Sequence, residues 1–260
     1  MTAAEAIERI QQKLAAEGIV WRAGGRDTFK AGDPATSVRG IATTGMSTLD
    51  VLQRAAAKGR NLVITHEPTF YNDRDLATGL EADPIYRAKQ RFVAEHGMVM
   101  WRFHDHAHQL KPDPLVAGSA RALGWTAYAS PTEPRLYILP VTTLRALASE
   151  VARRLNDRAI RVVGDPDMKV SRVVLGPGYG MPPLTSAVDV SVGGEIAESG
   201  GNAAYALDAA AAGMPRGMII LGHMMSEDHG MMEVAEWLRT FMTGVAVEFV
   251  PAGEPFAPPM

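Results

Sequence analysis

Residues 38–68, VRGIATTGMSTLDVLQRAAAKGRNLVITHEP, decide the fold class. Residues 38–45 have the composition of a strand that ends in a turn, and residues 47–59 have the apolar spacing of an amphipathic helix. Ser47 is expected to cap that helix. The apolar run at 61–65 then predicts a short buried strand. A strand, a helix and a second strand in this order indicate two parallel strands joined by a crossover helix.

The same alternation continues along the chain and predicts an α/β fold, with a mainly parallel sheet and helices on its faces. Turn-forming residues cluster at 126–134, so we expect one lobe from residues 1–126 and 214–260 and a second lobe from residues 127–213. The further helices are expected at 1–18, 82–97, 112–124, 142–156, 202–213 and from Ser226 to about Met242. The further strands are expected at 98–103, 135–140, 159–164, 171–176, 187–192 and 217–222.

The composition of the 260 residues excludes several classes of protein. The net charge is −3 and no basic block is present, which argues against a nucleic-acid partner. The absence of cysteine excludes disulfides, thiolate zinc sites and cysteine-ligated iron–sulfur clusters. Glu5, Glu8 and Lys13 interrupt the first helix, and no apolar run is long enough to cross a bilayer. We therefore expect a cytoplasmic protein without a membrane partner, in which histidine and carboxylate side chains hold any metal.

Imidazole and carboxylate groups gather where three of the predicted strands end. Six of the seven histidines lie within a few residues of these ends. Because ligands bind outside the carboxyl ends of parallel strands, the groups are expected to share one site. In the absence of thiolates, they suit zinc, iron or manganese. The strands at 61–65, 98–103 and 217–222 are followed by His66 with Glu67, by His104 with Asp105, and by His223 with Glu227 four residues later.

Other residues in these segments have plainer interpretations. A single histidine at a strand end is more often a hydrogen-bonded surface or core residue than a ligand, and His96 and His229 are assigned to that class. His106 and His108 can be solvated loop residues. The glycines of GPGYG at 176–180 do not have the G-x-G-x-x-G spacing of a dinucleotide site, so this segment predicts a tight turn.

These motifs resemble the Nif-three-like family of dinuclear metal-centre proteins, some of which are labelled GTP cyclohydrolase type-two homologues. GRNLVITHEP at 59–68 is similar to the family's histidine element, and residues 101–115 are similar to the segment with its metal-binding aspartate. Residues 192–227 are similar to its closing segment, where GH with a glutamate four residues on is the most specific part. The resemblance implies two α/β lobes with the metals in the cleft between them, and a ring-like hexamer. It also implies the ligands His66, Asp105, His223 and Glu227, with Glu195 at an acidic position.

The sequence departs from the family pattern at three positions. Glu67 stands where the family commonly has a second histidine, and Trp101 stands where it commonly has a histidine four residues before the aspartate. As a fifth ligand, Glu67 adds negative charge, which predicts a preference for harder ions such as manganese or iron over zinc. His104 replaces an apolar residue and is a candidate proton shuttle. An equally weighted alternative makes it a partner that orients a ligand.

These features together predict a metal-dependent hydrolase with two divalent metal ions (iron, manganese or zinc). Its substrate would be a small nucleotide-like or phosphate-containing molecule of unknown identity. The main alternative is a non-catalytic metal-binding protein, such as an iron carrier or a regulatory subunit, that uses the same ligands. A third hypothesis is a purely structural component of an oligomer.

Overall fold

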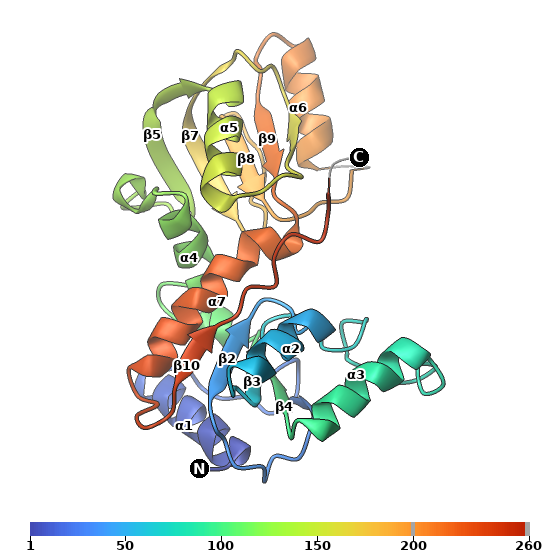
Figure 1. Cartoon of the computed structure of the whole chain (residues 1–260). Coiled ribbons are helices and arrows are strands. Elements are labelled where there is room, and N and C mark those ends of the chain that lie inside the picture. Colours follow the sequence, from blue (N-terminus) through green and yellow to red (C-terminus); the bar gives the residue numbers. More distant parts are fainter. Residues whose placement is uncertain (199–200, 258–260) are drawn as a thin grey trace. The chain divides into compact units, whose positions relative to one another are not determined.

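The computed structural model describes residues 1–198 and 201–257, and the chain divides into two compact units. Unit 1 comprises Met1–Pro114 and Gly230–Ala252, and unit 2 comprises Leu115–His229 and Gly253–Met260. Each unit contains a five-stranded sheet with helices packed against it (Figure 1). The expected α/β class is confirmed, whereas the expected lobe boundaries stay a prediction.

The sheet of unit 1 has a parallel core and one antiparallel edge strand. Thr44, Thr65 and Arg102 lie opposite one another on three adjacent parallel strands. These strands therefore end level, and the residues that follow leave the sheet at one edge. The strand order is β1 (Phe29–Ala31), β4 (Val99–Arg102), β3 (Leu62–Thr65), β2 (Ile41–Thr44) and β10 (Val247–Phe249), with β1 antiparallel to β4.

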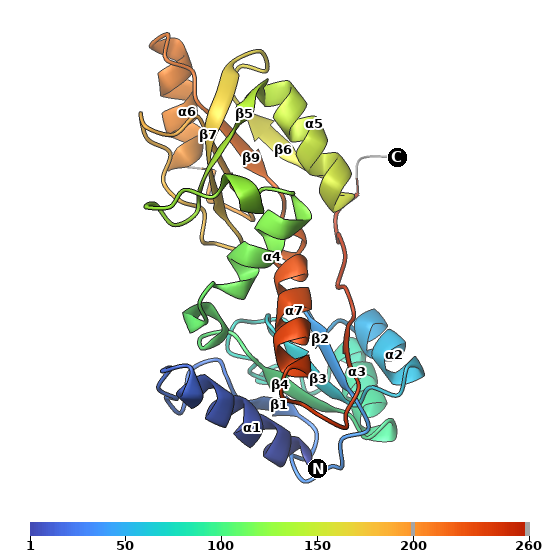
Figure 2. The ribbon, with the colours of Figure 1, turned by 90° about the vertical axis from the view of Figure 1, so that its left-hand side faces the viewer.

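Helices cover both faces of this sheet (Figure 2). Helices α2 (Leu49–Ala57) and α3 (Pro84–Glu95) pack on one face, where their apolar side chains meet those of the strands. Helix α1 (Ala3–Ala16) and the part of α7 (His223–Arg239) that belongs to unit 1 lie on the other face. The buried residues shared with α2 and α3 are Ala42, Val51, Leu52, Ala55, Val63, Val93, Met98, Met100 and Val250.

The sheet of unit 2 repeats this plan with antiparallel strands at both edges. Helices α4 (Pro114–Ala122) and α5 (Leu144–Leu155) contribute to its main core, and α6 (Asn202–Ala211) contributes to a second one. A short 3-10 turn, η2 (Thr126–Tyr128), follows α4. The strand order is β5 (Leu136–Thr143), β7 (Lys169–Gly176), β8 (Val190–Gly193), β9 (Gly217–Ile220) and β6 (Arg161–Val163), with β5 and β6 antiparallel to their neighbours.

Three details of the structure correct the expectations. Thr48, not Ser47, caps α2, because its hydroxyl accepts the N–H of Val51. Helix α7 begins at His223 rather than near Ser226, whose hydroxyl donates to the His223 carbonyl one turn back. Strands β1 and β10 have three residues each and were not predicted. Among the helices of the described residues, none is long and apolar enough to span a membrane.

Candidate metal centre

His66 and Glu67 follow β3 on a backbone that is fixed by hydrogen bonds. The N–H groups of His66 and Glu67 donate to the carbonyls of Thr44 and Gly45 over 3.1 and 2.8 Å. The Arg102 Nε donates to the His66 carbonyl over 2.9 Å. The His66 side chain is fully buried, and its Nδ1 lies 3.0 Å from the carbonyl oxygen of Phe103. The imidazole is therefore held in one orientation.

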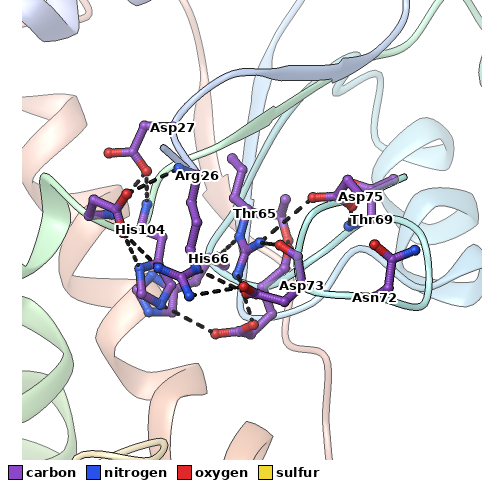
Figure 3. A network of polar contacts seen from close by, with 12 residues as sticks. Arg26, Asp27, Thr65, His66, Thr69, Asn72, Asp73, Asp75 and His104 are labelled. Carbon is purple, nitrogen blue, oxygen red and sulfur yellow. Dashed lines mark hydrogen bonds and ion pairs between the residues drawn. The ribbon is translucent and has the colours of Figure 1, made fainter. Parts of the chain in front are cut away.

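Asp27 anchors the histidine-rich segment that follows β4. Its carboxylate is buried and accepts the backbone N–H groups of His104, Asp105 and His106 over 2.5, 2.9 and 2.8 Å. The same carboxylate lies 2.6 Å from Nδ1 of His106. Figure 3 shows Asp27 beside His104 in this network. The solvated-loop interpretation of His106 is wrong, because its ring is 2% exposed and stacks on Trp21.

Three imidazoles of unit 1 meet at the end of the sheet. The His104 ring stacks on the His66 ring with centroids 4.4 Å apart, and the His108 ring faces both edge-on at 5.0 Å. Each ring offers one ligand nitrogen, and these nitrogens lie within 4.8 Å of one another. His108 is therefore part of an imidazole cluster and is not simply a solvated loop residue, although its side chain is 34% exposed.

Asp105 lies against His104 and Arg26. One carboxylate oxygen is 3.0 Å from Nδ1 of His104, and the other accepts the backbone N–H of Arg26 over 3.0 Å. The Arg26 guanidinium reaches the first oxygen at 3.4 Å. Burial acts to raise the pKa of Asp105, but the Arg26 N–H and the His104 ring outweigh it and lower the pKa. Asp105 is thus an anion in direct contact with the imidazole cluster.

Arg102 supplies a positive charge next to Glu67. Its guanidinium is fully buried, and Nη2 lies 3.2 Å from Glu67 Oε2 and 3.3 Å from Asp73 Oδ1. The expected preference for harder ions took the negative charge of Glu67 without this partner. Arg102 offsets part of that charge, although the same guanidinium also pairs with Asp73 and Asp75.

The imidazoles of His66 and His104 are neutral bases in this setting. Burial lowers the pKa of His66 well below its usual value, and the neighbouring rings of His104 and His108 lower it further. Burial also lowers the pKa of His104, against the opposing effect of Glu67, whose Oε1 lies 3.7 Å from Nε2. A neutral imidazole is the form that binds a metal ion.

Unit 2 contains a second group of donors at the start of α7. His223 and Glu227 lie one helical turn apart, with Nε2 and Oε2 separated by 3.2 Å. Glu195, which the resemblance places at an acidic position, is half-buried, and its Oε1 lies 3.4 Å from Nδ1 of His223. The tight turn at 176–180 packs here, since the N–H of Gly178 donates to the Ser226 hydroxyl over 2.9 Å.

Within unit 1 the structure brings together His66, Glu67, His104, Asp105 and His108, and within unit 2 it brings together His223, Glu227 and Glu195. Sequence reasoning missed Asp27 and Arg102, because nothing local marks a partner 77 or 35 residues away. The signal for His108 was available. Histidines four residues apart on one turn, such as His104 and His108, are a common arrangement of metal ligands.

Comparison with known proteins identifies the family. The model of the Duf34/NIF3 (NGG1p interacting factor 3) family matches residues 21–255, nearly the whole chain. The chain belongs to the Duf34/NIF3 family. The resemblance seen in the sequence is thereby confirmed, and the donor groups described above are the candidate metal-binding residues of a Duf34/NIF3 protein.

Solved structures share the fold over their full length. The Staphylococcus aureus protein SA1388 has a TM-score of 0.75 at 19% identity, with 100% of this chain and 99% of that chain covered. A Bacillus cereus protein related to NIF3 has a TM-score of 0.72 at 14% identity, with the same coverage. Reduced HcgD from Methanocaldococcus jannaschii has a TM-score of 0.58 at 16% identity, with 96% and 98% covered. At these identities the likeness concerns the fold. No curated protein sequence matches this chain significantly.

Proposed function

We propose that this Duf34/NIF3 protein is a metal-dependent hydrolase of small phosphate-containing or nucleotide-like molecules that works with two divalent ions. Unit 1 would supply His66, Glu67 and Asp105 as metal ligands, and unit 2 would supply His223 and Glu227. One observation carries the proposal: in both units, imidazole and carboxylate groups gather where parallel strands end. Ligand sites of open parallel sheets lie at such ends.

The chemistry of the donors fits divalent ions of the first transition series. All are imidazole nitrogens or carboxylate oxygens, which suit zinc, iron and manganese. When bound, such ions lower the pKa of water and stabilise negative charge on a substrate oxygen. Glu195 faces Nδ1 of His223 and so favours the tautomer that carries its proton on Nδ1. The unprotonated nitrogen, Nε2, then lies toward Glu227. The backbone carbonyl of Phe103 likewise favours the tautomer of His66 that carries its proton on Nδ1.

His104 has a less favourable geometry for the proton-shuttle role. Its Nδ1 faces Asp105 at 3.0 Å, and its ring stacks on the buried His66. A proton carrier needs a ring nitrogen that can exchange with water and then with substrate. Stacking on His66 and the contact of Nδ1 with Asp105 instead fix the ring of His104. A fixed ring suits a metal ligand or a residue that orients one.

The proposal is tested by turnover after controlled metal loading. Protein stripped of metal and reloaded with zinc, manganese or iron(II) is screened against nucleoside phosphates and cyclic amidine substrates. Activity is expected with loaded protein, and Glu227→Gln is expected to lower kcat/KM by about 100-fold or more. Glu236→Gln, which changes an exposed carboxylate on the same helix, is the matched control. Tight metal binding without turnover of any of these substrates would favour the non-catalytic carrier instead.

The preference among ions depends on the pair formed by Glu67 and Arg102. Removing the guanidinium in Arg102→Gln leaves Glu67 uncompensated, so the ratio of manganese to zinc affinity is expected to rise. Glu67→His is expected to lower that ratio, and exposed Arg39→Gln should not change it. Competition titration of the two metals measures the ratio. An unchanged ratio in both Glu67→His and Arg102→Gln would remove Glu67 from the ligand set.

We further propose a hexameric assembly, which the family resemblance implies. We also propose a cytoplasmic location, as expected from the sequence. Light scattering of the purified protein tests the assembly. A mass near six times 27.9 kDa is expected, and a mass near that of one chain would contradict the hexamer.

A further inference from the structure

The imidazole cluster of unit 1 contains two histidines that the proposed ligand set does not use. His104 and His108 lie four residues apart on the segment that includes the 3-10 turn η1 (Ala107–Gln109), where the His108 N–H donates to the His104 carbonyl over 3.3 Å. Both rings contact His66, which comes from the neighbouring strand end. Three imidazoles from two segments of unit 1 therefore lie close together.

Each of the three rings faces an acceptor through its Nδ1. The partners are the carbonyl oxygen of Phe103 at 3.0 Å for His66, Asp105 at 3.0 Å for His104, and Asp113 at 3.1 Å for His108. A carbonyl or an ionised carboxylate can only accept a hydrogen bond, so each neutral ring keeps its proton on Nδ1. The lone pair of each ring then lies on Nε2. This pattern of acceptor, imidazole and lone pair is the one that orients histidine ligands around a metal ion.

The three rings of the cluster differ in burial, and their ligand nitrogens lie close together. His66 is fully buried, whereas the side chains of His104 and His108 are 21% and 34% exposed. The ligand nitrogens lie within 4.8 Å of one another, and an ion with bonds of about 2.1 Å would hold them no more than about 4 Å apart. Movements of about an ångström by the two partly exposed side chains, His104 and His108, close that difference. Three imidazoles are the protein ligands of three-histidine zinc sites.

The segment is also rigid before any ion binds. Asp27 accepts the consecutive N–H groups of His104, Asp105 and His106, so the backbone between the two candidate ligands is fixed. The ring of His106 is directed away from the cluster, to Asp27 and to the backbone N–H of Arg22. The histidine between the two candidate ligands thus has a structural role, and His104 and His108 point to the same side as His66.

We propose that His66, His104 and His108 form a divalent-cation site within unit 1, with Asp105 and Asp113 as the carboxylates that orient two of its imidazoles. The inference rests on the proposed metal-binding function and adds His104 and His108 to the ligands. An all-imidazole set favours zinc or cobalt(II) over manganese, because manganese prefers oxygen ligands.

Titration of the metal-free full chain with cobalt(II) tests the site by its visible absorption and by bound metal per chain. His104→Ala and His108→Ala are each expected to lose one bound ion, or to weaken its binding by at least 100-fold. His96→Ala is the matched control, because His96 is an exposed histidine whose Nδ1 also faces a carbonyl. Asp113→Asn keeps the ligands and is expected to weaken binding by about 10-fold, with the form of the spectrum unchanged.

The outcomes separate this inference from the proposed function. If wild type binds cobalt(II) and both His104→Ala and His108→Ala bind it with unchanged stoichiometry and affinity, the three-imidazole site is wrong and the proposed ligand set stands. If wild type binds no divalent ion, the proposed function fails together with the site. An unchanged Tm of each metal-free variant excludes loss of the fold as the reason for a lost ion. If His108→Ala is unstable, His108→Gln replaces it in the titration.

Discussion

Asp27 is the residue on which the histidine segment of unit 1 depends. Its carboxylate is buried, yet three consecutive backbone N–H groups and a histidine ring surround it. A carboxylate that accepts this many hydrogen bonds fixes the backbone to which the donors belong. The candidate ligands His104 and His108 therefore depend on a residue that itself binds no metal.

Replacement of Asp27 is expected to affect stability and metal binding together. Asp27→Ala leaves buried N–H groups without acceptors, so the free energy of unfolding should fall by about 3–5 kcal/mol. Cobalt(II) affinity should fall by about 10- to 100-fold, because the orientation of His104 is lost. Urea unfolding and metal titration measure the two effects. Asp33→Ala, which removes an exposed carboxylate with one backbone donor, should change neither by much.

Some residues of the site could be predicted from the sequence, and others could not. His66, His223 and Glu227 could be assigned because they follow recognisable strands, and strand ends are where ligands are expected. Arg102 could not be assigned, because it occupies a strand and reads as an interior sheet residue. Its partners Glu67 and Asp73 lie 35 and 29 residues away. Only the side-by-side pairing of β3 and β4 brings these charges together.

At the level of elements, α3 is joined to the segment after β3 by a buried lysine. Lys89 is 3% exposed, and its ammonium donates to the carbonyl of Thr69 and lies over the rings of Phe70 and Tyr71. Burial lowers the pKa of Lys89 to about 8, against the attraction of Asp75. This contact fixes α3 to the chain immediately beyond His66 and Glu67.

The lowered pKa of Lys89 predicts a pH dependence of stability. The unfolded-state pKa is about 10.5, so between pH 8 and 10.5 the unfolded chain binds more protons than the folded chain. The free energy of unfolding contributed by this group therefore rises with pH across that window, by about 3 kcal/mol at full extent. Lys89→Met should abolish the rise, and Lys13→Met on α1 should keep it. Urea unfolding at pH 7.5, 9 and 10.5 measures the difference, and identical profiles for Lys89→Met and wild type would contradict it.

The turn between β7 and β8 is shaped by the side chains of α7. Gly178 has a φ of +60°, and a Cβ added there would lie 2.1 Å from Oε1 of Glu227. Gly178→Ala is therefore expected to displace Glu227 and weaken metal binding in unit 2 by at least 10-fold. Cobalt(II) titration measures this effect. Gly213→Ala, at a positive φ with open space around the Cβ, separates backbone strain from the clash with Glu227.

The sequence predicts most elements of both units and misses β1 and β10, the two short edge strands of unit 1. Long amphipathic helices and apolar strands have clear periodic patterns, and all of those expected appear in the structure. Strand β10 has three residues and pairs with β2, about 200 positions earlier in the chain. A local pattern cannot reveal such a pairing, because its stability comes from the partner strand.

For the whole molecule, metal binding is expected to raise resistance to unfolding. An ion that binds only the folded chain adds about 2.7 kcal/mol at a concentration 100 times its Kd. For a chain of this size the increase corresponds to a rise in Tm of roughly 5–10 °C. Thermal unfolding with zinc and with a chelator measures the difference. A chelated sample that melts at the same temperature as the zinc-loaded sample would contradict the proposed sites.

The discontinuous make-up of unit 1 has a consequence for synthesis. Its sheet includes β10, and the Thr43 hydroxyl donates to the carbonyl of Met231, so the unit is complete only after residue 230 and the strand that follows have been made. By then the continuous segment Leu115–His229, with nearly all of the sheet and helices of unit 2, has already been synthesised. Unit 1, whose larger part is translated first, is therefore completed last. In nascent chains that stop before β10, unit 2 is expected to resist protease while the incomplete unit 1 is cleaved.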